Sequence, residues 1–191
     1  MDDRTVPSAH VRHNFEGLAL AFPPAYLLSF VLNSEAEPLR GGNDFAHIAR
    51  SRMPGIFGVT YQYQELDAEL SGAIRLSIDQ YKALRDTVAQ AYAVLLSRQA
   101  SSGVDWDIVE EIAENARSAV VFAFKGDDSD GRVLVTPRNL NPEGLYRVRS
   151  LDAGDVGSAT GEELMRDGIE IVHLGGSRAH VIILNEVLQA F

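Results

Sequence analysis

The sequence Gly55-Ile-Phe-Gly-Val-Thr-Tyr61, which follows Met53-Pro54, decides the fold class. It is short and apolar, as the buried strands of parallel sheets are. A similar run, Gly17-Leu-Ala-Leu-Ala-Phe22, lies upstream and stops at Pro23-Pro24. It predicts a second buried strand, and residues 25–32 predict a short apolar helix after it.

Strands of this kind need neighbours at both edges and helices over both faces, so two or three of them cannot close a sheet alone. Residues 1–63 therefore predict one portion of a larger α/β domain. Its unpaired strands would expose apolar edges and faces. We expect this portion to aggregate, to pair with a partner chain or to be poorly ordered.

The clearest helix is expected over residues 67–99, with Asp67 as its N-cap. Its apolar residues alternate between spacings of three and four, which places them on one face: Leu70, Ile74, Ile78, Tyr81, Leu84, Val88, Tyr92 and Leu95. Ser101-Ser-Gly103 ends the helix and is expected to be a linker. The predicted domains are therefore residues 1–100 and residues 104–191.

The second domain is rich in predicted strands. Gly-, Asn- and Asp-containing turns separate them, and they cover residues 106–114, 118–125, 131–137, 144–150, 168–174 and 179–188. A brief helical turn is expected between Thr160 and Arg166. Short strands at this spacing are typical of an antiparallel β-sandwich.

Composition excludes several classes of function. The formal net charge is -10 and no long basic run occurs, which argues against a nucleic-acid partner. The chain has no cysteine, so disulfides, thiolate metal sites and cysteine nucleophiles are excluded. Prolines interrupt the longest apolar run, so no membrane span is expected. Met1-Asp-Asp-Arg4 does not resemble a signal peptide, and a cytoplasmic location is expected.

Three motifs in the second domain point to a family. They are Gly144-Leu-Tyr-Arg-Val-Arg149, Ser158-Ala-Thr-Gly-Glu-Glu-Leu-Met165 and Gly168-Ile-Glu-Ile171. Together they resemble the C-terminal domain of glycoside hydrolase family 36, the bacterial α-galactosidases or melibiases. Ser118-Ala-Val-Val-Phe-Ala-Phe124 resembles an earlier strand of that domain.

The resemblance continues upstream in the same order. Tyr81-Lys-Ala-Leu-Arg85 is similar to a motif on the last barrel helix of the family. Met53-Pro-Gly-Ile-Phe-Gly58 is similar to its last barrel strand, and Phe22-Pro-Pro24 to the strand before. Residues 29–52 depart from the family because they lack the His-x-Ser-x-x-Pro-Asn-His stretch of many members. This departure leaves galactose specificity open.

The resemblance implies an α+β chain in two parts. The first part would be the C-terminal portion of a (β/α)8 barrel, with its last strands and final long helix. The second would be an antiparallel β-sandwich that braces the barrel. Family members are retaining glycosidases, in which one Asp attacks the anomeric carbon and another acts as acid/base. The carboxyl groups of these two Asp residues lie roughly 5 Å apart.

The resemblance also assigns a candidate catalytic residue. The family's acid/base lies in a Ser-Asp-Asx segment upstream of the aromatic-Pro-Pro motif. By that register Asp2, twenty residues before Phe22, is the acid/base, with Asp3 as the alternative. Both could instead be polar residues of a frayed terminus. No Lys-x-Asp-like nucleophile context occurs in this sequence, so this chain alone is expected to be inactive.

Other side chains could contact a sugar or a metal. Tyr61 and Tyr63 follow the last predicted barrel strand, where barrel enzymes bind substrate, and Arg52 could reach sugar hydroxyls or be a surface charge. Trp106 and Tyr146 could also stack on a sugar, although for Trp106 packing against the long helix is favoured.

His10, His13 and Glu16 are spaced by three and could hold a metal, but a solvated helix face is favoured. His47, His173 and His180 are expected to be structural. No metal and no cofactor are expected.

The leading hypothesis is the C-terminal part of an α-galactosidase-like retaining glycosidase that acts on α-linked sugars. Its partner would be an α-galactoside-like carbohydrate, which it could bind only when the rest of the barrel is present. A partner chain or a homo-oligomer could supply the rest of the barrel if the same polypeptide does not. The alternative is a stand-alone, non-catalytic β-sandwich module that binds carbohydrate or protein.

Overall fold

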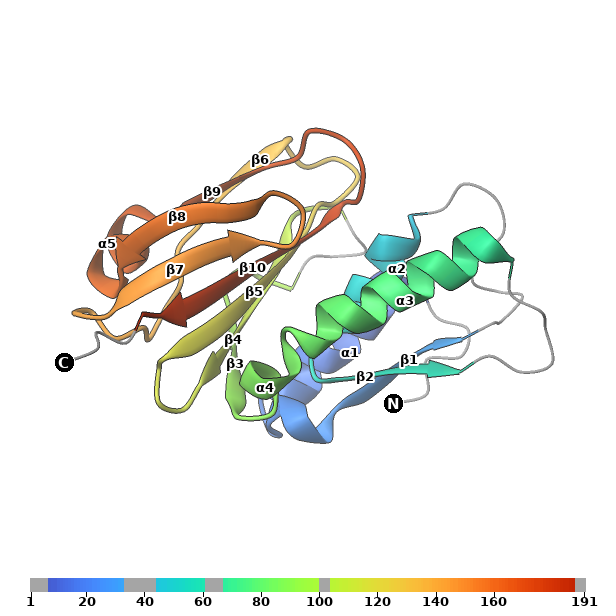
Figure 1. Ribbon diagram of the computed structural model, residues 1–191, viewed down its shortest axis with the longest axis horizontal. Coiled ribbons are helices and arrows are strands. Elements are labelled where there is room, and N and C mark those ends of the chain that lie inside the picture. The colour runs from blue at the N-terminus through green and yellow to red at the C-terminus, as the bar shows by residue number, and fades with distance from the viewer. Residues whose placement is uncertain (1–6, 33–43, 61–66, 100–103, 188–191) are drawn as a thin grey trace.

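The computed structural model describes residues 7–32, 44–60, 67–99 and 104–187. A helical part carries a two-stranded parallel sheet, and beside it lie two antiparallel sheets (Figure 1). The helices are α1 Ser8–Ala19, the 3-10 helix η1 Pro24–Tyr26, α2 Phe45–Arg50, α3 Ala68–Lys82, α4 Arg85–Val88 and α5 Gly161–Asp167. The strands are β1 Leu28–Leu32, β2 Ile56–Thr60, β3 Ala91–Leu95, β4 Asp107–Ala113, β5 Ser118–Phe124, β6 Arg132–Val135, β7 Leu145–Ser150, β8 Gly154–Thr160, β9 Ile169–Val172 and β10 Ala179–Glu186.

β1 and β2 form the parallel pair, in a register that runs from Leu28 opposite Ile56 to Leu32 opposite Thr60. The prediction of a strand after Met53-Pro54 is therefore confirmed. Gly58 allows the Phe30 ring to lie over β2, because a Cβ at Gly58 would come within 2.5 Å of Phe30 Cδ1.

The assignments on either side of Pro23-Pro24 were wrong. Residues 17–22 are not a buried strand: they contain the end of α1 and the turn after it, and Leu20 is 75% exposed. Residues 25–32 are not a helix, since they contain η1 and strand β1. In β1, buried Ser29 and Val31 alternate with half-buried Leu28 and Phe30, which is the period of a strand.

The helix predicted over residues 67–99 is also too long. Asp67 caps α3 as predicted, accepting a hydrogen bond from Leu70 N at 2.7 Å. The helix ends at Lys82, α4 follows, and Ala91–Leu95 is strand β3, paired antiparallel with β4. The apolar positions of β3 fit a helical spacing, but pairing with β4 satisfies their backbone groups instead. The sheet therefore begins before the linker predicted at residues 101–103.

The larger sheet has six strands in the order β3-β4-β5-β10-β7-β8, and β6 pairs with β9 in a second sheet. All the pairs in these two sheets are antiparallel, as predicted, and each of the six predicted strands overlaps an observed one. The sequence interpretation missed β3 and β8. The helical turn predicted between Thr160 and Arg166 is α5.

The central strands of the large sheet, β4, β5 and β10, are buried on both faces. Val109, Phe122 and Val181 pack against the helical part, together with Phe15 of α1. The side chains that alternate with these along the strands point to the other face and pack toward β6 and β9. They are Ile108, Ile112, Val121, Ile182 and Leu184. Within the described ranges, none of the helices has the length and apolar character that a membrane crossing requires.

Candidate functional site

The carboxyl edge of the parallel pair is the candidate functional edge. β1 and β2 run in the same direction, so Leu32 and Thr60 end at the same edge. In α/β barrels, ligand sites form at this edge from the segments that follow the strands. Tyr61 and Tyr63 follow β2 directly in the sequence, but they lie outside the described residues, as do Asp2 and Asp3.

The two faces of the parallel pair differ. Leu27 and Val31 pack against the helices with Phe15 and Ile48. The opposite face carries half-buried Leu28 and Phe30 and the exposed Ile56. The same pattern is found on each strand of a barrel, where one face meets the outer helices and the other lines the interior.

Arg52 lies inside the protein and is 1% exposed. Its Nε donates to Phe30 O at 2.8 Å, and its Nη1 donates to Ile48 O at 3.0 Å and to Ser8 Oγ at 3.1 Å. These contacts join α1, α2 and β1 beneath the carboxyl edge. The alternative that Arg52 is a surface charge is therefore wrong, and its role as a sugar contact stays a prediction.

A buried ion pair joins α1 to the large sheet. Arg12 Nε donates to Asp107 Oδ2 at 2.6 Å, and Arg12 Nη1 donates to Ser51 Oγ at 2.9 Å. The guanidinium also lies 4.3 Å from the centroid of the Phe124 ring. Burial, and then the hydrogen bond and charge of Asp107, raise the pKa of Glu16 to about 9. At neutral pH Glu16 is therefore a neutral carboxyl group beside the Arg12–Asp107 pair.

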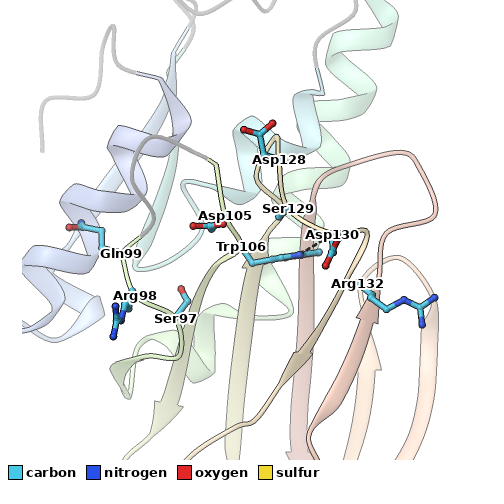
Figure 2. A pocket seen from close by; sticks show the side chains of 9 residues that line it. All are labelled: Ser97, Arg98, Gln99, Asp105, Trp106, Asp128, Ser129, Asp130 and Arg132. Carbon is cyan, nitrogen blue, oxygen red and sulfur yellow. Dashed lines mark hydrogen bonds between the residues drawn. The ribbon is translucent and has the colours of Figure 1, made fainter.

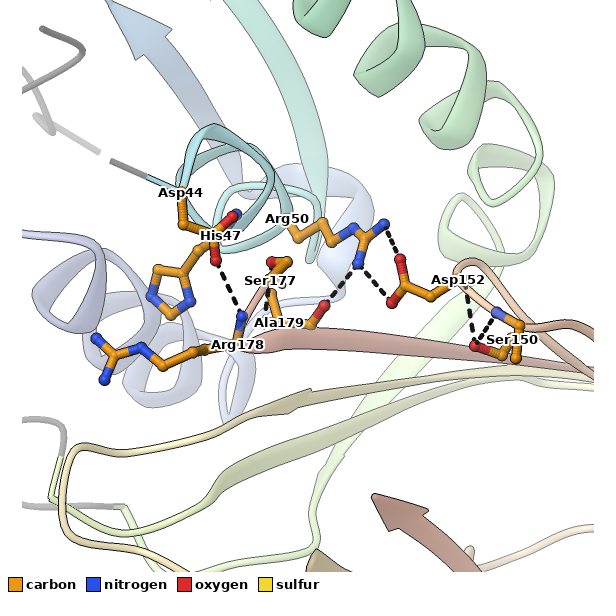
Figure 3. A network of polar contacts seen from close by, with 9 residues as sticks. Asp44, His47, Arg50, Ser150, Asp152, Ser177, Arg178 and Ala179 are labelled. Atoms are coloured by element: carbon orange, nitrogen blue, oxygen red, sulfur yellow. Dashed lines mark hydrogen bonds and ion pairs between the residues drawn. The ribbon is translucent and has the colours of Figure 1, made fainter. Parts of the chain in front are cut away.

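A second contact joins α2 to the turn after β7 and to β10, as Figure 3 shows. Arg50 donates to both carboxylate oxygens of Asp152, at 2.8 and 2.7 Å, and to Ala179 O at 2.6 Å. Asp44, the N-cap of α2, also accepts from Arg178 N at 2.9 Å. Arg50 is thus a buried link between the two parts of the molecule.

A pair of buried glutamates in β4 escaped the sequence interpretation. Glu111 Oε1 accepts from Gly55 N at 3.0 Å, and Glu110 Oε2 accepts from Arg138 N at 2.8 Å. Burial raises the pKa of Glu111 to about 8 and that of Glu110 to about 7, while their backbone hydrogen bonds act in the opposite direction. The signal in the sequence is that two carboxyls interrupt the apolar strand Ile108–Ala113.

The aromatic candidates of the sandwich serve its packing. Trp106 is 8% exposed, its Nε1 donates to Asp130 O at 2.9 Å, and it packs between the sheets instead of against α3. Tyr146 is fully buried and bonds to Ala116 O and Asn141 N. Trp106 borders a polar cavity of about 620 Å³, shown in Figure 2, whose lining includes Asp105 and Asp128.

The histidines form no metal centre in the described part of the chain. No group of three or more His, Asp or Glu side chains there has a geometry that could hold a metal ion. Glu16 instead belongs to the Arg12–Asp107 cluster. Burial, and then the charge of Arg12, lower the pKa of His47 to about 4, and His173 packs edge-on against His180.

Comparison with protein-family models and with curated proteins finds no match. Solved structures do match. The galactosidase domain of the α-galactosidase–sucrose kinase AgaSK is 19% identical, with a TM-score of 0.78 over 97% of this chain and 25% of that one. The family 36 α-galactosidase AgaB of Geobacillus stearothermophilus is 18% identical, with a TM-score of 0.77 over 97% and 25% of the two chains. An α-galactosidase of Lactobacillus brevis is 13% identical, with a TM-score of 0.77 over 100% and 26%.

These identities are low, so the likeness concerns the fold, and this chain spans about a quarter of the length of each matched structure. The order of the motifs along the sequence and the superposition nevertheless agree on the same portion of the same family. The chain therefore has the fold of the C-terminal quarter of the glycoside hydrolase family 36 α-galactosidases.

Proposed function

We propose that this chain is the C-terminal part of an α-galactosidase-like retaining glycoside hydrolase that acts on α-linked sugars. The observation that carries the proposal is the superposition of 97–100% of the chain on about a quarter of each family 36 structure. The glycosidase would work on a carbohydrate at the carboxyl edge of β1 and β2, in the cytoplasm. The missing barrel would come from the same polypeptide, from a partner chain or from an oligomer.

In this proposal α1 to α4 and the parallel pair supply the last part of a (β/α)8 barrel. Two observations support it. The sheet of β1 and β2 has two strands, so within the described ranges each strand has one unpaired edge. One of its faces is covered by helices, whereas Leu28, Phe30 and Ile56 line the other. In a closed barrel the neighbouring strands would pair with both edges, and the uncovered face would be the packed interior.

The antiparallel sheets would brace this barrel portion. Polar contacts at three places support the role. Arg12 with Asp107, Arg50 with Ala179 O, and Gly55 N with Glu111 are buried, and Arg50 also pairs with the partly exposed Asp152. Buried hydrogen bonds require a fixed geometry, because a displaced partner leaves a polar group unsatisfied. The two parts are therefore held in one relative orientation.

The chemistry would need a second carboxylate from the missing barrel. Asp2 is proposed as the acid/base, with Asp3 as the alternative. Tyr61 and Tyr63 would contact the sugar, with Arg52 as a further candidate. A retaining mechanism requires a nucleophile on the other side of the glycosidic bond. Because this chain supplies at most one of the two groups, it is expected to be inactive alone.

The test is to sequence the coding region upstream of this one and to produce the joined protein or the two chains together. We expect the assembled protein to hydrolyse an aryl α-galactoside, and this chain alone to show no turnover. Asp2→Asn in the assembled protein should lower the rate roughly 100- to 10,000-fold, the range of general acid-base catalysis. Asp79→Asn, at an exposed position of α3, is the matched control and should leave the rate unchanged.

Two results would overturn the proposal. One is turnover by this chain alone that Asp2→Asn abolishes. The other is an upstream region without the remaining barrel strands and nucleophile, combined with a stable monomer that binds free sugars weakly. The second result would favour the stand-alone β-sandwich module.

A further inference from the structure

The peptide groups at the start of β2 are held from three sides. Gly55 N donates to Glu111 Oε1 at 3.0 Å, and Gly55 O accepts from Tyr81 Oη at 2.9 Å. The next amide, Ile56 N, donates to Leu27 O at 2.7 Å. These three hydrogen bonds, which we term the Gly55 clamp, come from β4, α3 and the residue before β1.

Only glycine fits at the centre of the Gly55 clamp. The φ angle of Gly55 is +81°, in the region that side chains disfavour, and a Cβ there would lie 2.4 Å from Leu27 O. The backbone at Gly55 thus lies too close to the Leu27 carbonyl for any side chain to fit between them. The position of Gly55 along the strand axis has little freedom.

Glu111 is the member of the Gly55 clamp whose burial is energetically unfavourable. Its side chain is 0% exposed, and Oε2 has no hydrogen-bond partner among the described residues. Burying a carboxyl group in an apolar core is unfavourable, and an aliphatic side chain would fill the same space without that cost. Glu111 lies opposite Ala93 of β3 and Val120 of β5, both apolar. The acceptor for Gly55 N is the contact that an aliphatic residue could not supply.

The contact has a consequence at the far end of β2. The strand runs from Ile56 to Thr60 and leads directly to Tyr61, which the sequence predicts to contact the sugar. An extended strand has a nearly fixed rise per residue, so fixing its start also fixes the axial position of its end.

We propose that Glu111 is a positioning residue, through which the antiparallel sheet sets the placement of β2 up to its carboxyl edge at Thr60. The role of that edge in sugar binding rests on the proposed function. The placement of β2 by Glu111 does not.

The protonation state of Glu111 provides a spectroscopic handle. Burial raises its pKa to about 8, so the carboxyl is mostly neutral at pH 7 and ionises as the pH rises through 8. Two other ionisable groups lie near the Gly55 clamp, Tyr81 and Arg85. Burial raises the pKa of Tyr81, the charge of Glu111 raises it further, and the charge of Arg85 lowers it. An ionised carboxylate is a stronger acceptor than a neutral carboxyl, so the Gly55 amide resonance should shift as Glu111 ionises.

The test is amide NMR on this chain from pH 6 to pH 10. We expect the Gly55 amide to titrate with a midpoint near the Glu111 pKa of about 8. Glu111→Gln should keep the hydrogen bond and abolish the titration. Glu111→Leu should remove the acceptor, shift the amides from Gly55 to Thr60 and speed their hydrogen exchange at least about tenfold through easier local opening.

The neighbouring residue is the matched control. Glu110 is equally buried but faces the other side of β4, where it accepts from Arg138 N. Glu110→Leu should therefore leave the amides from Gly55 to Thr60 unchanged. If Glu111→Leu does not fold, the comparison of the wild type with Glu111→Gln decides.

The proposal is overturned if Glu111→Leu affects β2 no more than Glu110→Leu does. It is also overturned if the Gly55 amide titrates in the same way in Glu111→Gln as in the wild type. None of these measurements needs turnover. An inactive assembled enzyme would therefore contradict the proposed function and leave the role of Glu111 in placing β2 intact.

Discussion

Glu110 and Glu111 are adjacent in β4 and face opposite sides of the large sheet. Glu111 shares its face with Val109, toward the helical part, and Glu110 shares its face with Ile108 and Ile112, toward the second sheet. Each has one carboxyl oxygen that accepts a backbone N–H and one without a partner among the described residues. The folded protein is therefore more stable when these two carboxyl groups are protonated, so its free energy of unfolding depends on pH.

For Glu110 the direction of this dependence follows from its pKa, which burial raises from 4.5 to about 7. Between these values the folded state holds a proton that the unfolded state has lost. The contribution of Glu110 to the free energy of unfolding is therefore full below pH 4.5 and is lost as the pH rises to 7. Between pH 5 and pH 8, the wild type should lose on the order of 2 kcal/mol more than Glu110→Gln does.

Urea denaturation of both proteins at the two pH values measures this difference. Glu143→Gln, at an exposed position, is the control and should follow the wild type. Parallel pH profiles for the wild type and Glu110→Gln would show that folding does not raise the pKa of Glu110.

At the scale of elements, short helices depend on their ends. α5 runs from Gly161 to Asp167 and is too short to be stable by propensity alone. Its N-terminus carries a complete capping box, in which Thr160 Oγ1 accepts from Glu163 N at 3.2 Å and Glu163 Oε2 accepts from Thr160 N at 2.8 Å. The helix also buries Leu164 between the two sheets. Met165 packs against the same cluster, so the cap and these two apolar contacts fix α5 in place.

Thr160→Ala should lower the free energy of unfolding by about 1 kcal/mol, because it leaves Glu163 N without its capping oxygen. Chemical denaturation measures the loss. Ser158→Ala, at an exposed position of neighbouring β8, should change stability by less than about 0.5 kcal/mol. Equal effects of the two substitutions would mean that the capping box contributes nothing.

At the scale of the whole molecule, charged groups lie where two apolar layers meet. The helical part and the large sheet share one core, which contains Phe15, Val31, Leu84 and Phe122. The Arg12–Asp107 pair crosses this core with both side chains almost fully buried. A buried pair adds little net stability compared with apolar residues, but removing one member leaves an unpaired buried charge.

Arg12→Met should therefore destabilise the protein by about 3–5 kcal/mol, since Asp107 loses its counter-ion. The double variant Arg12→Met, Asp107→Leu should recover a large part of that loss. Lys82→Met breaks the exposed pair with Asp79 and should cost less than about 1 kcal/mol. Urea denaturation compares the variants, and a double variant no more stable than Arg12→Met would refute the unpaired-charge explanation.

How much of the fold could be predicted depends on what each residue pattern reports. Apolar periodicity reports which side of a segment is buried, and it located β2 and the strands from β4 to β10 except β8, whose small and polar residues give no such pattern. It could not locate β3, because Tyr92 and Leu95 suit a helix as well as a strand until β4 is there to pair with them. The prediction of a buried strand from Gly17 to Phe22 was wrong for a related reason, because apolar residues there are exposed at and after the end of α1.

Residue patterns alone predicted the parallel strand after Met53-Pro54, the antiparallel sheets of the second half and the likeness to the C-terminal part of the family 36 α-galactosidases. Those features are local or depend only on the order of segments. Two features became apparent in the three-dimensional structure alone: Arg50 and Arg52 are buried and link different elements, and Glu111 accepts a hydrogen bond from Gly55 N. Charged residues are usually exposed, so a sequence does not show which of them a fold will bury, because burial depends on partners that lie far away along the chain.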